Sequence, residues 1–307
     1  MHIQALYPAD GILPVISSNL QLLVINLASV PGGQLVNSPT AAILDRYLPL
    51  FLDSVHNLDR KKMPFTFSHP AAVIPMTYLP RRWVSLTGLV IGSMTPDFEY
   101  FLRMRVYSSY SHTWTGMLWF DLPLTIILAF LYHSIVRNKL IDNLPLILKN
   151  RLLVFKQFMW TRYFKSNFLV VLLSCIVGTM THILWDGFTH QHGQYVEAIS
   201  TLQQTFMIDG LGIPVYKALQ HTSSLIGGLL VLYSFFQLPV DTSLSNKTEP
   251  LFYWLSVTLI ALTVVALRFF TGLGNNYIGN IIVTVITGGL IGLILTPTIL
   301  RVRYNGR

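Results

Sequence analysis

Residues 167–192 read NFLVVLLSCIVGTMTHILWDGFTHQH, and this stretch decides the fold class. An apolar run of about 20 residues is long enough to cross the hydrocarbon core of a bilayer as a helix. The run Asn167–Asp186 has that length, and it ends with His182 and Asp186. Ionisable groups are costly to bury at membrane depth unless they have partners. The stretch therefore predicts a membrane helix with polar chemistry at one end.

The composition of the whole chain supports a membrane protein. Of its 307 residues, 52% are hydrophobic and 11% are charged, whereas a soluble domain has about 25% charged residues. These values exclude a disordered chain, a collagen-like chain and an ordinary soluble enzyme. Four further apolar runs have spanning length: Met117–Val136, His221–Leu238, Leu251–Phe270 and Asn280–Leu300. We therefore expect an all-α polytopic membrane bundle with about five spanning helices.

Shorter features divide the chain. The apolar stretch Val84–Met94 is too short to cross a bilayer, so we expect a buried or re-entrant helix there. Pro70, Pro75 and Pro80 exclude a long regular helix before it. Residues 1–62 are expected to be an N-terminal extension outside the fold, with Met63 as an alternative start. Residues 63–240 form the expected site-bearing domain, and residues 241–307 two scaffold helices and a basic tail.

The net charge of +8 is explained by topology. Lys and Arg gather in residues 137–166 and 301–307, and such loops face the cytoplasm. With three spans between them, residues 187–220 are expected outside a multi-pass cell membrane protein whose C-terminus is cytoplasmic. Because topology accounts for the charge, no nucleic-acid partner is expected. The bilayer is the expected partner, and the oligomeric state stays open.

The strongest candidate for a metal site is the end of the first quoted run. His182 and Asp186 are four residues apart, so they share one helix face. This spacing lets two side chains hold one ion, as two histidines do in zinc-protease helices. His190 and His192 follow in a loop and are expected to support the site. The alternative is that His182 and Asp186 only hydrogen-bond each other.

A second candidate follows Pro96, where Asp97 and Glu99 lie two residues apart. One acid could be a metal ligand and the other a general base, whereas the alternative is a helix cap by Asp97. The expected topology brings further ionisable groups to the same external face. These are His112 before a span, and His221 at the start of another, with Asp121 as a supporting residue early in a span. Such convergence is typical of a functional site.

Several motifs together resemble a known family. They are MPFTFSHPAAV at 63–73, GSMTPDFEY at 92–100, SHT at 111–113, FDLP at 120–123, THILWDGFTH at 181–190 and YKALQH at 216–221. Over residues 63–240 the chain resembles a bacterial membrane family classed as domain of unknown function 4184. That resemblance implies no activity.

The chain is also distantly similar to membrane-bound metal-dependent hydrolases of the SOS-regulated inner-membrane type. This similarity implies a divalent metal, zinc above all, in a bacterial inner membrane protein. The ligands that it implies are His69, Asp97, His112, His182 and Asp186. The chain departs from the motifs of these hydrolases at two places, and both bear on the activity more than on the metal. Glu99 stands where their Pro-Asp-x-Asp motif has its second Asp, and residues 111–113 read Ser-His-Thr where they have Thr-His-Ser.

The leading functional hypothesis is a metal-dependent hydrolase acting on a lipid-linked or other phosphoester near the outer leaflet. Asp97 or Glu99 would take the proton from water. A non-catalytic membrane protein with a structural or metal-storing polar cluster is the alternative. A transporter is less well supported, because transporters place their binding groups near the bilayer midplane.

Overall fold

The computed structural model describes residues 66–305, except residues 209, 242–249 and 272–277. The chain divides into two units, Met1–Arg60 and Lys61–Arg307, and every described residue belongs to the second. The extension expected at residues 1–62 and the start expected at Met63 therefore lie outside the described residues. The all-α class is confirmed, since the described chain is helical apart from one two-stranded hairpin.

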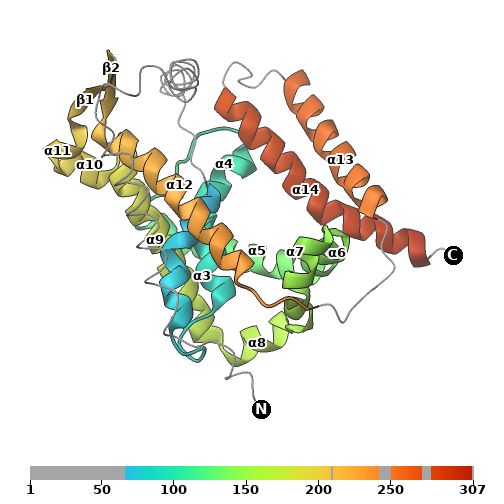
Figure 1. Ribbon diagram of the computed structural model, residues 1–307. Helices are drawn as coiled ribbons and strands as arrows, with labels where there is room; N and C mark the ends of the chain where they lie inside the picture. Colours follow the sequence, from blue (N-terminus) through green and yellow to red (C-terminus); the bar gives the residue numbers. More distant parts are fainter. Residues whose placement is uncertain (1–65, 209, 242–249, 272–277, 306–307) are drawn as a thin grey trace, which may run out of the picture. The chain divides into compact units, whose positions relative to one another are not determined.

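The elements run in chain order along the described chain (Figure 1). The first half consists of η1 (Thr66–Tyr78), α3 (Leu86–Gly92), η2 (Thr95–Asp97), α4 (Phe98–Arg103), η3 (Met117–Asp121), α5 (Leu122–Leu131), η4 (Tyr132–Val136), α6 (Arg137–Asn143), α7 (Leu146–Leu152), η5 (Leu153–Gln157) and α8 (Trp160–Ser166). The second half consists of α9 (Phe168–Thr189), α10 (Gln194–Ala198), α11 (Ser200–Gln203), β1 (Thr205–Ile208), β2 (Leu211–Pro214), α12 (Val215–Phe236), α13 (Pro250–Phe270) and α14 (Ile278–Asn305).

Four helical segments of the described chain are long and apolar enough to cross a membrane. They are Met117–Asn143, Phe168–Thr189, Pro250–Phe270 and Ile278–Ile299. The fifth span, expected at His221–Leu238, corresponds to α12, which is not among them. Its early turns carry the polar run Gln220–Ser224, which lowers their hydropathy. The expected number of five is therefore corrected to four for the described residues. The orientation in the membrane stays a prediction from charge.

The first of these spans is longer and less regular than expected. Two π-helical turns, η3 and η4, flank α5, and the helix continues through α6 to Asn143. Single π turns inside α-helices are uncommon and are frequent at functional sites. Asp121 is the last residue of the first π turn and is fully buried. The first π turn therefore contains the candidate supporting residue Asp121.

The stretch expected to be a short helix forms α3, which packs against α9. Small residues allow this close approach. A Cβ atom at Gly92 would lie 2.6 Å from the carbonyl oxygen of Cys175, and one at Gly178 would lie 2.4 Å from that of Leu89. Such small-residue contacts are typical of helix packing in membranes. The contact brings the end of α3 beside the polar end of α9.

The helices α13 and α14 lie side by side (Figure 1) and carry no His, Asp or Glu between residues 251 and 300. Of the two, α14 packs against α4. The hydroxyl of Thr287 donates to the carbonyl oxygen of Phe101 at 2.8 Å, and the side-chain oxygen of Asn280 accepts from the backbone N–H of Val106 at 2.9 Å. In the described structure α14 therefore packs against the segment that carries Glu99, and α13 packs against α14.

The loop between α9 and α12 is structured, which the sequence patterns did not predict. It contains α10, α11 and an antiparallel hairpin in which Thr205 pairs with Pro214 and Ile208 with Leu211. The helix α10 packs against α9, and α11 packs against α12. The first part of this region thus packs on the last turn of α9, where a Cβ atom at Gly187 would lie 2.8 Å from the ring of Tyr195.

Candidate metal centre

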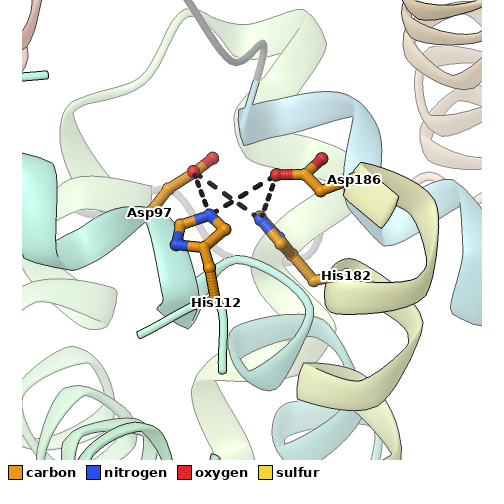
Figure 2. Close-up of side chains that lie close together, drawn as sticks. All are labelled: Asp97, His112, His182 and Asp186. Carbon is orange, nitrogen blue, oxygen red and sulfur yellow. Dashed lines mark ion pairs between the residues drawn. The ribbon is translucent and has the colours of Figure 1, made fainter. Parts of the chain in front are cut away.

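Four side chains from three separate segments meet in the described structure (Figure 2). Asp97 comes from η2, His112 from the loop before η3, and His182 and Asp186 from α9. Each offers one ligand atom, and the four atoms lie within 4.8 Å of one another. Four of the five ligands implied by the distant hydrolase similarity are thus in one group.

The spacing of these atoms fits a metal ion. Nε2 of His112 lies 3.4 Å from Oδ1 of Asp97 and 3.4 Å from Oδ2 of Asp186. Nε2 of His182 lies 3.6 Å and 3.3 Å from the same two oxygens. A tetrahedral zinc ion with bonds of about 2.1 Å separates its ligand atoms by about 3.4 Å. Each imidazole–carboxylate pair in the group has close to that separation.

Hydrogen bonding within the described structure does not account for these atoms. Both carboxylate oxygens of Asp97 and Nε2 of both His112 and His182 are buried without a hydrogen-bond partner there. Asp97 and His182 have no exposed surface. Buried polar groups normally have partners. Atoms that face one another at ligand spacing and lack other partners are suited to a shared cation.

Both histidines are oriented by their second ring nitrogen. Nδ1 of His182 lies 2.7 Å from the carbonyl oxygen of Ser93, to which it donates, and Nδ1 of His112 lies 2.9 Å from the hydroxyl of Ser111. Such bonds fix the tautomer of metal-binding histidines and leave Nε2 free for the ion. His112 also has a left-handed backbone, with φ of 40°. A non-glycine residue rarely adopts this conformation, which is common at functional sites.

The electrostatics of the cluster favour ionised carboxylates. Burial would raise the pKa of Asp97, but the nearby His182 and His112 hold it well below its usual range. Burial would lower the pKa of His112, but its contacts with Asp186 and Asp97 raise it to about 9. The carboxylates thus attract positive charge, which a proton on imidazole or a metal ion can supply.

His69 and His190 lie on the other side of Asp186. The ring of His69, from η1, stacks on that of His182 with centroids 3.8 Å apart, and its Nε2 is 3.6 Å from Oδ1 of Asp186. Burial and the neighbouring His182 lower the pKa of His69 to about 3, so the ring is neutral. Nδ1 of His190 lies 3.4 Å from the same oxygen.

The model of one family, described as a domain of unknown function (DUF4184), matches residues 63–298. The chain belongs to this DUF4184 family. The match extends past the residues 63–240 over which the motifs suggested it, so it includes α13 and most of α14. No curated protein and no solved structure matches the chain. The DUF4184 description assigns no activity, and the comparisons give no similarity to hydrolases.

Glu99 is occupied by other contacts in this DUF4184 protein. Its Oε2 accepts the backbone N–H groups of Tyr110 and Ser111, and its Oε1 accepts that of Ser109 and pairs with Arg103. Burial would raise the pKa of Glu99, but these hydrogen bonds lower it to about 2. The carboxylate therefore holds the loop that leads into His112. A role for Glu99 as general base stays a prediction.

The other residues expected to support the DUF4184 site lie in different settings. Asp121 is fully buried, and neither of its carboxylate oxygens has a hydrogen-bond partner among the described residues. His192 is exposed and lies 3.5 Å from Oε1 of Glu197. His221 is exposed on α12. His192 and His221 are not in the group of four.

Sequence reasoning missed two contacts in the DUF4184 site. The carbonyl of Ser93 orients His182, and the side-chain amide of Gln220 lies 3.0 Å from Nε2 of His190. A backbone carbonyl leaves no mark in a sequence, because every residue has one. Gln220 precedes His221, and the motif at 216–221 drew attention to the histidine. In the structure, the group that contacts His190 is the side-chain amide of Gln220.

Proposed function

We propose that this DUF4184 protein is a membrane-embedded, metal-dependent hydrolase. The observation that supports the proposal is the convergence of two imidazole nitrogens and two carboxylate oxygens at ligand spacing. Three of these atoms, Nε2 of His112, Nε2 of His182 and Oδ1 of Asp97, are buried without a hydrogen-bond partner in the described chain. Two imidazoles and two carboxylates suit Zn²⁺, and they also suit Mn²⁺ or Fe²⁺. Zinc is the cation that we expect, because the four imidazole–carboxylate separations are close to those of a tetrahedral site.

A divalent cation bound there would polarise a phosphoryl or carbonyl oxygen and make a water molecule more acidic. The chain supplies the proton acceptor. Oδ1 of Asp97 faces the two histidines, whereas its Oδ2 is free of hydrogen bonds from the described residues. Oδ2 of Asp97 is therefore the proposed general base. Glu99, held by the 109–111 loop, positions His112 instead of reacting.

Two of the four side chains are reached from outside the cluster. The side chains of Asp97 and His182 are 0% exposed, whereas those of Asp186 and His112 are 10% and 17% exposed. A substrate would therefore approach past His112 and Asp186. Because the described residues include four candidate spans, a lipid-linked phosphoester is the substrate class that we propose.

A structural metal site is the second candidate, and one observation favours it. Catalytic zinc usually has three protein ligands and an open position, whereas structural zinc has four. The group of Asp97, His112, His182 and Asp186 already offers four. A closed ion of this kind would hold α9 to the η2 segment and to the loop of His112 without reacting.

Metal analysis and a hydrolysis assay test the proposal. The full chain is purified in detergent, and its metal content is compared with that of His182→Ala and of His192→Ala, the latter an exposed histidine as matched control. We expect bound zinc in the wild type and the control, and its loss in His182→Ala. A chromogenic phosphodiester should be hydrolysed by the wild type, with at least about 100-fold less activity in His182→Ala. Metal without hydrolysis would favour the structural role, and no metal would refute both.

A further inference from the structure

We propose that the centre holds two cations, bridged by Asp186, and this inference rests on the metal site of the proposed function. The first cation is held by Asp97, His112, His182 and Oδ2 of Asp186. The second is held by Oδ1 of Asp186 with His69 and His190. His69, His190 and the second oxygen of Asp186 are ligands beyond those of the group of four.

The two oxygens of Asp186 face two different pairs of imidazoles. Oδ2 lies 3.3 Å from Nε2 of His182 and 3.4 Å from Nε2 of His112. Oδ1 lies 3.6 Å from Nε2 of His69 and 3.4 Å from Nδ1 of His190. A carboxylate used in this way places two ions about 3.5–4 Å apart, as in two-metal hydrolases.

One ion does not account for all four imidazoles around Asp186. A tetrahedral ion has four ligand positions, and the first group fills them. His69 and His190 then remain beside Oδ1, which is buried and lacks a hydrogen-bond partner in the described part of the chain. Oδ1, His69 and His190 provide three protein ligands, and a fourth position stays open. That is the arrangement of catalytic zinc sites.

Neighbouring elements position both added histidines. The helix η1, which carries His69, packs against α9 and α12. The approach of α12 is close, since a Cβ atom at Gly227 would lie 3.0 Å from the carbonyl oxygen of Ser68. On the other side, the amide nitrogen of Gln220 lies 3.0 Å from Nε2 of His190, and Nδ1 of the same ring lies 3.2 Å from the hydroxyl of Thr189. For Nδ1 to bind a cation, Nε2 must carry the proton and the amide of Gln220 must turn over, so that its oxygen accepts from Nε2–H as an outer partner does in metal sites.

Two cations explain how a closed four-ligand ion and catalysis can coexist. Asp97, His112, His182 and Oδ2 of Asp186 would hold the first cation and so join their three segments. Oδ1 of Asp186, His69 and His190 would hold the second cation and leave one position open, where it would supply Lewis-acid polarisation of a phosphoryl oxygen. In-line displacement at phosphorus is the reaction that paired ions stabilise. Two-ion sites occur in phosphatases and nucleases as well as in aminopeptidases, so a second ion agrees with the phosphoester class proposed above.

Manganese binding measures the number of sites directly. The full chain in detergent is stripped of metal, titrated with Mn²⁺ and examined by equilibrium dialysis and electron paramagnetic resonance. We expect two ions per wild-type chain, with the spectrum of a spin-coupled pair. His190→Ala and His69→Ala should each bind one ion with an uncoupled spectrum, and His192→Ala should still bind two. His190 is the primary variant, because His69 stacks on His182 and its replacement by alanine also removes that packing contact.

The outcomes separate this inference from the proposed function. One uncoupled ion in the wild type, with the same stoichiometry in His190→Ala, would overturn the second site and leave the four-ligand site standing. No bound Mn²⁺ or Zn²⁺ in any preparation would refute the proposed function as well. Two ions in His190→Ala would show that His190 is not a ligand, and this would also overturn the assignment.

Discussion

At the scale of single residues, the centre depends on groups that never touch the proposed ion. The Ser93 carbonyl sets the tautomer of His182, and the Glu99 carboxylate organises residues 109–111 just before His112. Removal of an outer partner of this kind typically lowers metal affinity 10- to 100-fold. The geometry of His112 is therefore sensitive to Glu99.

Glu99→Gln is the variant that tests this dependence. Glutamine has only one acceptor oxygen, so some of the three backbone N–H groups and Arg103 lose their partner. We expect Zn²⁺ affinity to fall about 10-fold or more, measured by competition with a chelating dye. Asp142→Asn, which removes the ion pair with Lys156, is the control and should keep its affinity. Equal affinities for both variants would mean that Glu99 does not position His112.

The pH dependence of stability gives a second prediction for Glu99. Its pKa is lowered from the ordinary 4.5 to about 2, so the ionised group stabilises the folded state more than the unfolded state. That contribution is complete above about pH 4.5 and is lost as the pH falls toward 2. The unfolding temperature of metal-free wild type should therefore fall more steeply over this window than that of metal-free Glu99→Gln. Parallel curves by thermal unfolding would contradict the assignment.

At the scale of elements, the contact of α3 with α9 decides where the Ser93 carbonyl lies. The two helices approach through Gly88, Gly92 and Gly178, at distances that leave no room for a side chain. Ser93 follows α3 directly, and His182 lies one turn beyond Gly178 on α9. A small displacement of α3 therefore moves the acceptor away from the ring that it orients.

Gly178→Ala should separate these helices. The new Cβ atom would lie 2.4 Å from the carbonyl oxygen of Leu89, a backbone atom that cannot turn aside. We expect a loss of about 1–3 kcal/mol in stability, with weaker metal binding because the Ser93 contact lengthens. Gly289→Ala is the matched control, since nothing lies within 4 Å of its Cβ position. A Gly178→Ala protein with unchanged unfolding temperature and metal affinity would show that α3 can shift freely.

At the scale of the whole described molecule, a bound ion would join segments that are far apart in the sequence. Asp97 and Asp186 are separated by the first candidate span and the basic loop after it. A ligand that binds only the folded state stabilises it in proportion to the logarithm of its concentration. The metal should therefore link η2, the His112 loop and α9 and stabilise the folded state.

Metal removal tests this role. At a Zn²⁺ concentration 100 times its dissociation constant, the stabilisation is about 2.7 kcal/mol, so a chelator should lower the unfolding temperature by several degrees. Re-addition of Zn²⁺ should restore it. His182→Ala should show neither response, whereas His192→Ala should respond as the wild type does. An unfolding temperature that ignores chelation in the wild type would mean that no ion links these segments.

The sequence by itself determined the membrane class and one half of the site. Apolar runs and the spacing of His182 and Asp186 are local patterns, and the helix period alone places these two side chains on one face. Local patterns wrongly predicted one membrane span, since α12 is a long helix with a polar start and is not among the four candidate spans of the described residues. They also left the alternatives for Asp97 and Glu99 open, because two acids after a proline have many possible partners.

Only the tertiary structure decided which groups meet. In the structure, Asp97 and His112 lie beside the end of α9, and the carboxylate of Glu99 accepts hydrogen bonds from backbone N–H groups. Two imidazoles face one oxygen of Asp186 and two face the other. The physical reason is that these contacts depend on close helix approach at glycines and on backbone donors and acceptors. Backbone groups are the same at every residue, so a sequence does not reveal which of them will lie beside a given side chain.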